Sequence, residues 1–406
     1  MITVYKNLSQ ILTLDNAHKK DGRKLLPEDL SIIENAAVVF DKDKIIWVGK
    51  TVNLPREYSH ETSFDLTGHI LTPEVVDSHT HLVFGGDRSF EYTMRLNGAD
   101  YEEIAKAGGG ILSTMEKTIT ASEDELFNLA VERITRIHSY GVGTIEIKSG
   151  YGLTTESERK ISEVIHKLKQ HFSGKVQILN TFLAAHAVPK SFETSHAFLL
   201  KVVLPLLEEL AQDKIIDFVD IFHEKGYFDL KDSKLLFERA TALGLKIKIH
   251  ADEFNDNKGA VLAAKFNAVS ADHLLCTGDD GIKDIANSKT VATLLPGTAY
   301  FLGKPLANAQ AFLDKGCKVA LASDYNPGSC HCDNLIMLAS LCAKNMNLNI
   351  AQLWAAITLN SAHALDLYQQ GAIKPDLSPR FSLFKCESVD QITYNWGRNF
   401  AVSLPK

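Results

Sequence analysis

Eight short strand-like runs, separated by segments with helical periodicity, fill the middle of this 406-residue chain. Consecutive parallel strands need crossover connections long enough to hold a helix, and the intervening segments have that length. Eight such units predict an α/β fold of the TIM type, a (β/α)8 barrel over 66–365. The expected strands lie within residues 70–77, 144–147, 176–179, 215–222, 246–250, 268–273, 291–295 and 318–323.

Local signals support two of the expected helices. Ser122 with Glu125, and Thr155 with Glu158, have the spacing of capping boxes at helix starts. Apolar residues then recur at helical spacing, and Gly141 follows the first helix as a stop signal. These two segments therefore begin the helical layer that should surround the strands.

The two ends of the chain have a different pattern. Apolar runs at 37–40 and 45–49 flank a short polar turn, which indicates a β-hairpin. A further extended run lies at 381–384. We expect residues 1–65 and 366–406 to meet in one small composite β-domain, a β-sandwich beside the barrel.

Composition excludes several classes of function. With 45% hydrophobic and 23% charged residues and a formal net charge of -7, the chain is an ordinary globular protein without the basic field of a nucleic-acid-binding protein. No apolar run approaches the roughly 20 residues that cross a bilayer. The start lacks the profile of a secretory signal, so the six scattered cysteines are expected to be reduced thiols in the cytoplasm.

Residues that bind metals stand where several strands end. His79 and His81 follow the first expected strand, and alternation of side chains in an extended segment turns both rings to one face. His250, His273 and Asp324 end three later strands. Because a barrel collects the carboxyl ends of its strands on one face, these side chains predict an active site there.

The donor set indicates catalysis. His79, His81, His250 and Asp324 offer three nitrogens and one oxygen and leave a position for water, which is typical of catalytic rather than structural sites. Imidazole suits zinc, iron and nickel alike. Most loop glutamates are simply solvated, but Glu253 lies three residues after His250 and could carry protons. The spacing of 330–332, Cys-His-Cys, is too tight for a standard zinc site.

These residues resemble the amidohydrolase superfamily, in which an Asp-x-His-x-His segment is followed by the same later histidines and aspartate. Longer strings resemble one family within it, the imidazolonepropionases, and the likeness extends from the first β segment to the tail. The strings are 79–88, 107–111, 146–153, 181–186, 250–253 and 323–329.

The resemblance implies hydrolysis of the ring amide of 4-imidazolone-5-propanoate to N-formimidoyl-L-glutamate, the third step of histidine degradation, by a homodimer. It implies one zinc or iron ion per chain on His79, His81, His250 and Asp324. On chemical grounds we expect Glu253 and His273 to divide the proton transfers, with Asp324 as the rival acceptor. The implied substrate contacts are Arg88, Tyr151, His186, Glu253, Asn326, Gly328 and Ser329.

Chemistry agrees with these assignments. Arg88 offers a bidentate fork to the propionate, and Asn326 with the backbone near Gly328 and Ser329 offers further donors. Tyr151 adds a phenolic donor. His186, at another strand end, could form a hydrogen bond with the ring carbonyl.

Two segments depart from the family pattern. Residues 222–224 read Phe-His-Glu where members often have Cys after the Phe. His223 could be a fifth ligand, although we favour a supporting role behind the metal ligands. No lysine ends this fourth strand, which argues against a binuclear site with a carboxylated lysine. The stretch 376–380 also differs from the superfamily's Gly-x-x-Ala-Asp and leaves the loop geometry of the β-domain open.

Two alternative functions stay open. Another enzyme of the superfamily, such as a deaminase of a heterocycle, would share the metal ligands; Arg88, Tyr151 and Asn326 favour a substrate with a carboxylate instead. A non-catalytic barrel used as a scaffold would be expected to lose ligands, whereas here the set is complete. A metal assay separates the scaffold from the enzymes.

Overall fold

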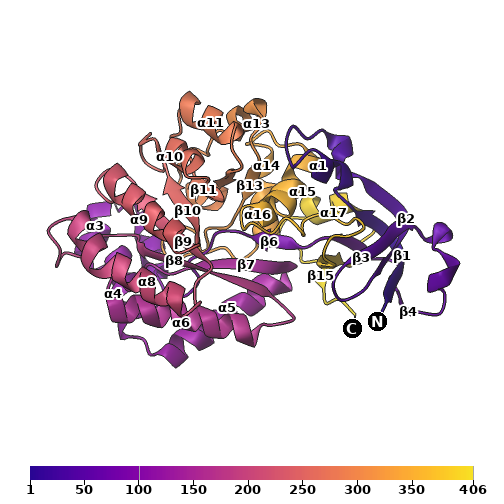
Figure 1. Cartoon of the computed structure of the whole chain (residues 1–406), viewed down its shortest axis with the longest axis horizontal. Helices are drawn as coiled ribbons and strands as arrows, with labels where there is room; N and C mark the ends of the chain where they lie inside the picture. Colours follow the sequence, from indigo (N-terminus) through magenta and orange to yellow (C-terminus); the bar gives the residue numbers. More distant parts are fainter. Residues whose placement is uncertain (100, 406) are drawn as a thin grey trace.

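Eight parallel strands form a nearly closed barrel in the computed structural model, which describes residues 1–99 and 101–405. Each strand pairs with its neighbours in chain order, as the alternation predicts. In Figure 1 the barrel and its helices occupy the left and centre, and a second sheet lies to the right, near both chain ends. The barrel strands are β6 (Val75–Asp77), β7 (Val142–Lys148), β8 (Gln177–Ala185), β9 (Phe218–His223), β10 (Lys246–Ala251), β11 (Ser270–His273), β12 (Val291–Leu294) and β13 (Val319–Leu321).

The first and last strands meet just beyond their carboxyl ends. The amide of His81 donates to the carbonyl of Tyr325 at 2.9 Å, and the amide of Asp324 donates to the carbonyl of His79 at 3.0 Å. A parallel bridge joins Thr80 and Tyr325. This closure brings the loop after β6 directly beside the loop after β13, although their residues are far apart in sequence.

Helices surround the strands (Figure 1). Ile161, Val164, Ile165 and Leu168 of α6 are fully buried, so the apolar face read from the sequence is the face that packs on the barrel. The helices are α1 (Asp15–Lys19), α2 (Ser89–Leu96), α3 (Tyr101–Lys106), α4 (Ile111–Thr120), α5 (Glu123–Ser139), α6 (Thr155–His171), α7 (Ser195–Phe198), α8 (Leu204–Gln212), α9 (Leu230–Ala242), α10 (Gly259–Lys265), α11 (Asp279–Ala286), α12 (Pro296–Phe301), α13 (Ala309–Lys315), α14 (Leu335–Ala343), α15 (Ile350–Ala356), α16 (Leu359–His363) and α17 (Val389–Tyr394).

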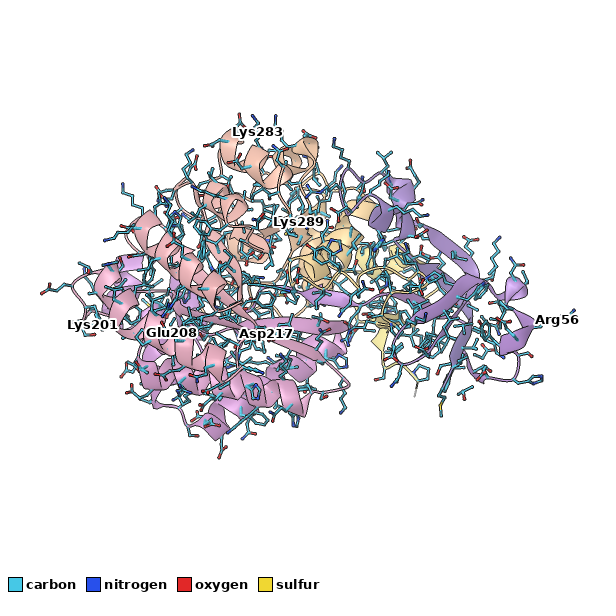
Figure 2. All side chains as sticks on the ribbon, viewed as in Figure 1. Arg56, Lys201, Glu208, Asp217, Lys283 and Lys289 are labelled. Carbon is cyan, nitrogen blue, oxygen red and sulfur yellow. The ribbon has the colours of Figure 1, made fainter. Side chains whose placement is uncertain are left out.

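Charged side chains cover the outside of this layer. Figure 2 shows Lys201 and Lys283 pointing away from the helices, and both are exposed. All six cysteines are unpaired. Within residues 1–99 and 101–405, no helix has the length and apolar character needed to cross a membrane.

Of the two predicted capping boxes, the first is confirmed in its N-cap residue, Ser122. Ser122 caps α5 and accepts a hydrogen bond from the amide of Glu125 at 3.1 Å. The prediction for α6 is wrong by one residue, because Thr154 caps this helix and accepts from the amide of Ser157. The carboxylate of Glu158 instead accepts from the amides of Gly152 and Leu153 in the loop after β7.

Both ends of the chain contribute to the second sheet. Its seven strands run in the order β15-β14-β5-β1-β2-β3, with β4 paired to β1. The predicted hairpin is present, since β2 and β3 pair antiparallel. The strands are β1 (Thr3–Leu12), β2 (Ile32–Phe40), β3 (Ile45–Lys50), β4 (Thr62–Asp65), β5 (Ile70–Pro73), β14 (Phe381–Phe384) and β15 (Ala401–Val402).

The stretch expected as the first barrel strand, 70–77, is divided between the two sheets. Its first half, β5, pairs with β1 and β14, and its second half, β6, starts the barrel. Between them Glu74 forms two hydrogen bonds of 2.7 Å with Arg380, in the stretch that departs from the family pattern. The mixed sheet therefore extends to residue 73; the division of the chain into two domains stays a prediction.

Candidate active site

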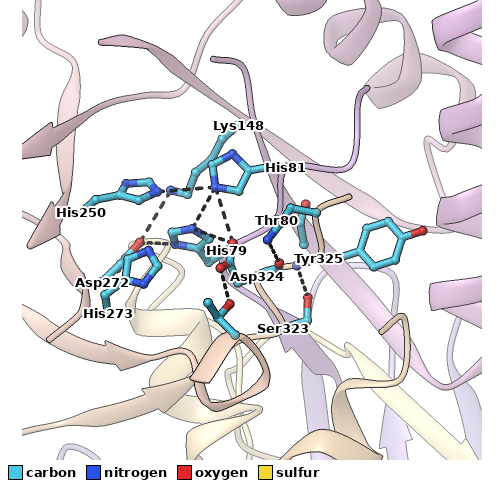
Figure 3. Close-up of polar contacts among 12 residues, drawn as sticks. His79, Thr80, His81, Lys148, His250, Asp272, His273, Ser323, Asp324 and Tyr325 are labelled. Atoms are coloured by element: carbon cyan, nitrogen blue, oxygen red, sulfur yellow. Dashed lines mark hydrogen bonds and ion pairs between the residues drawn. The ribbon is translucent and has the colours of Figure 1, made fainter. Parts of the chain in front are cut away.

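Three histidine rings and one carboxylate converge at the carboxyl end of the barrel. His81 Nε2 lies 3.2 Å from His79 Nε2 and 3.5 Å from His250 Nε2. Oδ1 of Asp324 lies 3.5 Å from His79 Nε2 and 3.6 Å from His81 Nε2. Figure 3 shows these groups turned toward one another, and all four side chains are buried.

This spacing fits a single metal ion. Four ligand atoms in a tetrahedron about zinc, with bonds of about 2.0–2.1 Å, lie about 3.4 Å from one another. The three histidines form a group with metal-ligand spacing, and the oxygen of Asp324 stands at nearly the same distance from two of them. Neutral nitrogens and one carboxylate oxygen suit a divalent ion such as zinc or iron.

The backbone is constrained at two of the strand ends. Asp324 has φ of 52° and His273 has φ of 78°, both in the left-handed region that residues other than glycine seldom adopt. Such conformations concentrate at functional sites, where the surrounding structure holds them. For Asp324, Oδ2 accepts a hydrogen bond from the Thr298 hydroxyl of α12, which leaves Oδ1 facing the histidines.

Glu253 and His273 lie together beside the cluster. Oε2 of Glu253 is 3.7 Å from Nε2 of His273, whose ring centre is 5.1 Å from that of His250. Burial, followed by the neighbouring carboxylates of Asp324 and Glu224, raises the pKa of Glu253 to about 8. Burial lowers the pKa of His273 well below its ordinary value, so this ring is neutral.

His186 and Tyr151 border the cluster on another side. The His186 ring stacks on the His81 ring, with centres 5.1 Å apart and planes at 15°. Its Nδ1 lies 3.2 Å from the carbonyl of Gly150, an arrangement that requires the proton on Nδ1. Burial lowers the pKa of His186 to about 4, so Nε2 of the neutral ring carries a lone pair. Tyr151 is buried, with its ring 5.9 Å from that of His81.

Arg88 is held by a partner that the sequence interpretation did not name. Its Nε and Nη2 donate to the two carboxylate oxygens of Glu91 at 2.8 and 2.6 Å. Glu91 also accepts a hydrogen bond from the amide of Gly110 at 2.8 Å, so the glycine-rich segment 107–111 contacts this carboxylate. The opposite side of the guanidinium faces Gly328, where a Cβ would lie 2.0 Å from Nη1. Only glycine permits this approach.

The amide group of Asn326 is used within its own loop. Its Oδ1 accepts from the amides of Gly328 and Ser329, both at 2.8 Å. Its Nδ2 donates to the carbonyl of Asp324 at 2.7 Å and to the Ser329 hydroxyl at 2.9 Å. The side chain therefore holds the loop that follows Asp324. Its Nδ2 group, which was expected to donate to a substrate, donates within that loop instead.

Two further candidates lie outside the cluster of ligands. His223 places Nδ1 2.9 Å from the Ser233 hydroxyl and Nε2 3.2 Å from the carbonyl of Asn257, so both nitrogens are engaged elsewhere. His331 lies 3.1 Å from the hydroxyl of Tyr325. Neither belongs to the group with metal-ligand spacing.

Several buried charges next to the site were not assigned a role from the sequence. Asp220 and Asp272 contact the ligands His250 and His79, and Lys148 lies between them. The sequence signal that could have found them is a charged residue inside a strand that is otherwise apolar. Their partners could not be read, because those come from strands that are distant in sequence.

No family model matches the chain. A protein named imidazolonepropionase from Bdellovibrio bacteriovorus is 41% identical over 371 residues, which covers 90% of this chain and 86% of that protein. Another imidazolonepropionase, from Bacillus cereus, is 40% identical over 400 residues and covers 97% of this chain and 93% of its own length.

Solved structures share the fold at low identity. Atrazine chlorohydrolase from Arthrobacter aurescens TC1, complexed with zinc, superposes with a TM-score of 0.72 at 14% identity over 98% of this chain and 92% of that chain. An adenosine deaminase from Xanthomonas campestris with bound zinc gives a TM-score of 0.68 at 14% identity, covering 98% and 90%. Likeness at this level supports the barrel architecture and not a substrate.

Proposed function

The chain belongs to the imidazolonepropionase family, and we propose from this that it hydrolyses the ring amide of 4-imidazolone-5-propanoate to N-formimidoyl-L-glutamate. One zinc or iron ion per chain would be held by the three histidines of the cluster and Asp324. The observation that carries the proposal is the convergence of four ligand atoms at 3.2–3.6 Å. The family resemblance implies a homodimer and the sequence predicts a cytoplasmic location, and both stay predictions.

The proposed roles follow from the geometry. When bound, the metal would lower the pKa of the attacking water toward about 7 and polarise the carbonyl of the substrate. Glu253 would give its proton to the ring nitrogen as the carbon–nitrogen bond breaks, and would regain a proton from the water that has added to the carbonyl carbon. Its raised pKa supports this role, because the carboxyl then keeps the proton near neutral pH. Asp324 is the rival for accepting that proton.

His186 would bind the ring in a different way from the one first expected. Because its Nδ1–H donates to Gly150, the neutral ring has only an acceptor at Nε2. An acceptor suits a ring N–H of the substrate rather than the carbonyl oxygen. His273, neutral and 3.7 Å from Glu253, would contact the carbonyl oxygen or the attacking water.

Arg88 would bind the propionate. Glu91 engages Nε and Nη2 and so fixes the plane of the guanidinium. The Nη1 side, next to Gly328, is then directed toward the loop that Asn326 shapes. A fixed planar fork is the arrangement that suits a carboxylate.

Turnover of fresh 4-imidazolone-5-propanoate tests the proposed function. The same protein is offered cyclic amides without the propionate and aminated heterocycles. We expect release of N-formimidoyl-L-glutamate from the imidazolone alone at an appreciable rate. Deamination of a heterocycle, with no opening of the imidazolone, would make the chain a deaminase of the same superfamily.

Replacing Arg88 by Ala should raise KM with the metal content unchanged. A charge-assisted contact of this kind is worth roughly 1.5–3 kcal/mol, about one to two orders of magnitude in kcat/KM. Arg159→Ala is the control, since Arg159 of α6 pairs with Glu209 of α8, on the outer layer of helices. An analogue without the propionate should be processed equally by Arg88→Ala and the wild type; continued strong discrimination by Arg88→Ala contradicts the carboxylate role.

A further inference from the structure

Two of the three histidine ligands have an aspartate behind them. Nδ1 of His79 lies 2.7 Å from Oδ2 of Asp272, and Nδ1 of His250 lies 3.0 Å from Oδ2 of Asp220. Both aspartates are fully enclosed in the barrel, at 0% and 1% exposure. The approach of Asp220 to His250 is an ion-pair distance only, because the buried Nδ1 of His250, like that of His81, has no hydrogen-bond partner among the described residues.

A single lysine links the two aspartates. Nζ of Lys148 lies 2.8 Å from Asp220 and 3.6 Å from Asp272, and it donates to Glu146 at 2.7 Å. Lys248 adds a second ammonium group 3.8 Å from Asp272. Figure 3 shows Lys148 and Asp272 directly beside the ligand rings. Three carboxylates and two ammonium groups thus form a buried layer of net negative charge beneath the cluster.

The contacts determine which nitrogen of each ring can bind a cation. A carboxylate at Nδ1 keeps the proton on that atom, and Nε2 then presents its lone pair to the metal. It also holds the ring plane and makes the ligand more basic, which strengthens metal binding.

We propose that Asp272 and Asp220 are positioning residues of the metal centre, acting through His79 and His250, and that Lys148 couples the two. This inference rests on the metal site of the proposed function. Because both aspartates share one ammonium group, loss of Asp220 leaves Lys148 free to move toward Asp272. The two contacts are therefore not independent, although they support different ligands from different strands.

Affinity for zinc, measured by competition with a chelator, tests the positioning role. Asp272→Asn and Asp220→Asn keep the shape of the side chain and remove its charge. Each should weaken zinc binding by about 10–100-fold and alter the visible absorption of the cobalt-substituted protein. Asp232→Asn is the matched control, because Asp232 is also buried and lies 2.7 Å from Nδ1 of a histidine, His196, away from the site. Its zinc affinity should not change.

The outcomes separate the inference from the function on which it depends. A wild type that binds no zinc or iron contradicts the proposed metal site itself. A wild type that binds one ion, with both Asn variants at wild-type affinity and cobalt spectrum, contradicts the positioning role. If one of the two Asn variants does not fold, the zinc affinity of the other variant tests the positioning role.

The double variant tests the coupling through Lys148. Combining Asp272→Asn with Asp220→Asn should weaken binding by less than the product of the two separate losses, as expected for residues in one network. A loss equal to that product would contradict coupling and leave two independent supports.

Discussion

Asp324→Ala should purify with almost no bound metal and with hydrolysis of the imidazolone below detection. In the proposed site Asp324 would supply the one oxygen ligand, since its Oδ1 lies 3.5 and 3.6 Å from the Nε2 atoms of His79 and His81. Without the metal, the pKa of the attacking water rises from about 7 to that of bulk water, so hydroxide at neutral pH falls by about eight orders of magnitude. Elemental analysis and a turnover assay on the same preparation measure both effects.

The control for this prediction is Asp232→Ala, which removes another buried aspartate and leaves the cluster untouched. It should keep the metal and the activity. Near-stoichiometric metal and normal turnover in Asp324→Ala would show that Asp324 is not a ligand.

Glu253→Gln should lower kcat by about 10²–10⁴-fold while the metal and the substrate still bind, the range for loss of a general acid–base group. Burial raises the pKa of Glu253 to about 8, so the protonated form prevails below that pH and disappears above it. The step that needs this proton therefore slows as pH rises through the pKa. Because glutamine does not titrate, that limb of the pH–rate profile should be absent from the variant.

Glu238→Gln, an exposed position on α9, serves as the control and should match the wild type. A Glu253→Gln protein with nearly normal kcat and an unchanged profile would move the proton transfer to Asp324 or His273. Metal content, measured in the same samples, excludes loss of the ion as the cause of a lower rate.

The parts of the fold that could be predicted are those that depend on the local pattern of apolar and polar residues. Strand positions followed from apolar runs, and the approach of His79 to His81 followed from alternation along one segment. The division of 70–77 between two sheets did not follow, because the whole stretch is apolar and its pairing partners, β1 and β14, come from both ends of the chain. The helix start at Thr154 was missed by one residue because neighbouring threonines compete to cap it.

The candidate ligands could be proposed from the sequence, whereas the residues that contact them could not. A histidine at a strand end is visible in the sequence, whereas its contact with Asp272 spans 193 positions and depends on how the barrel closes. Glu91 could have been found, since it lies three residues from Arg88 on one helical turn. The hydrogen bonds between the Asn326 side chain and its own loop depend on a turn whose geometry the residue types alone did not determine.

Titration of the metal-free protein with zinc or iron tests the central claim most directly. Rates of 4-imidazolone-5-propanoate hydrolysis are recorded after each addition and plotted against equivalents of metal per chain. We predict no activity without metal, a linear rise, and saturation at one equivalent. Full activity in the metal-free protein, or saturation at two equivalents, would contradict a hydrolase that works with one ion held by His79, His81, His250 and Asp324.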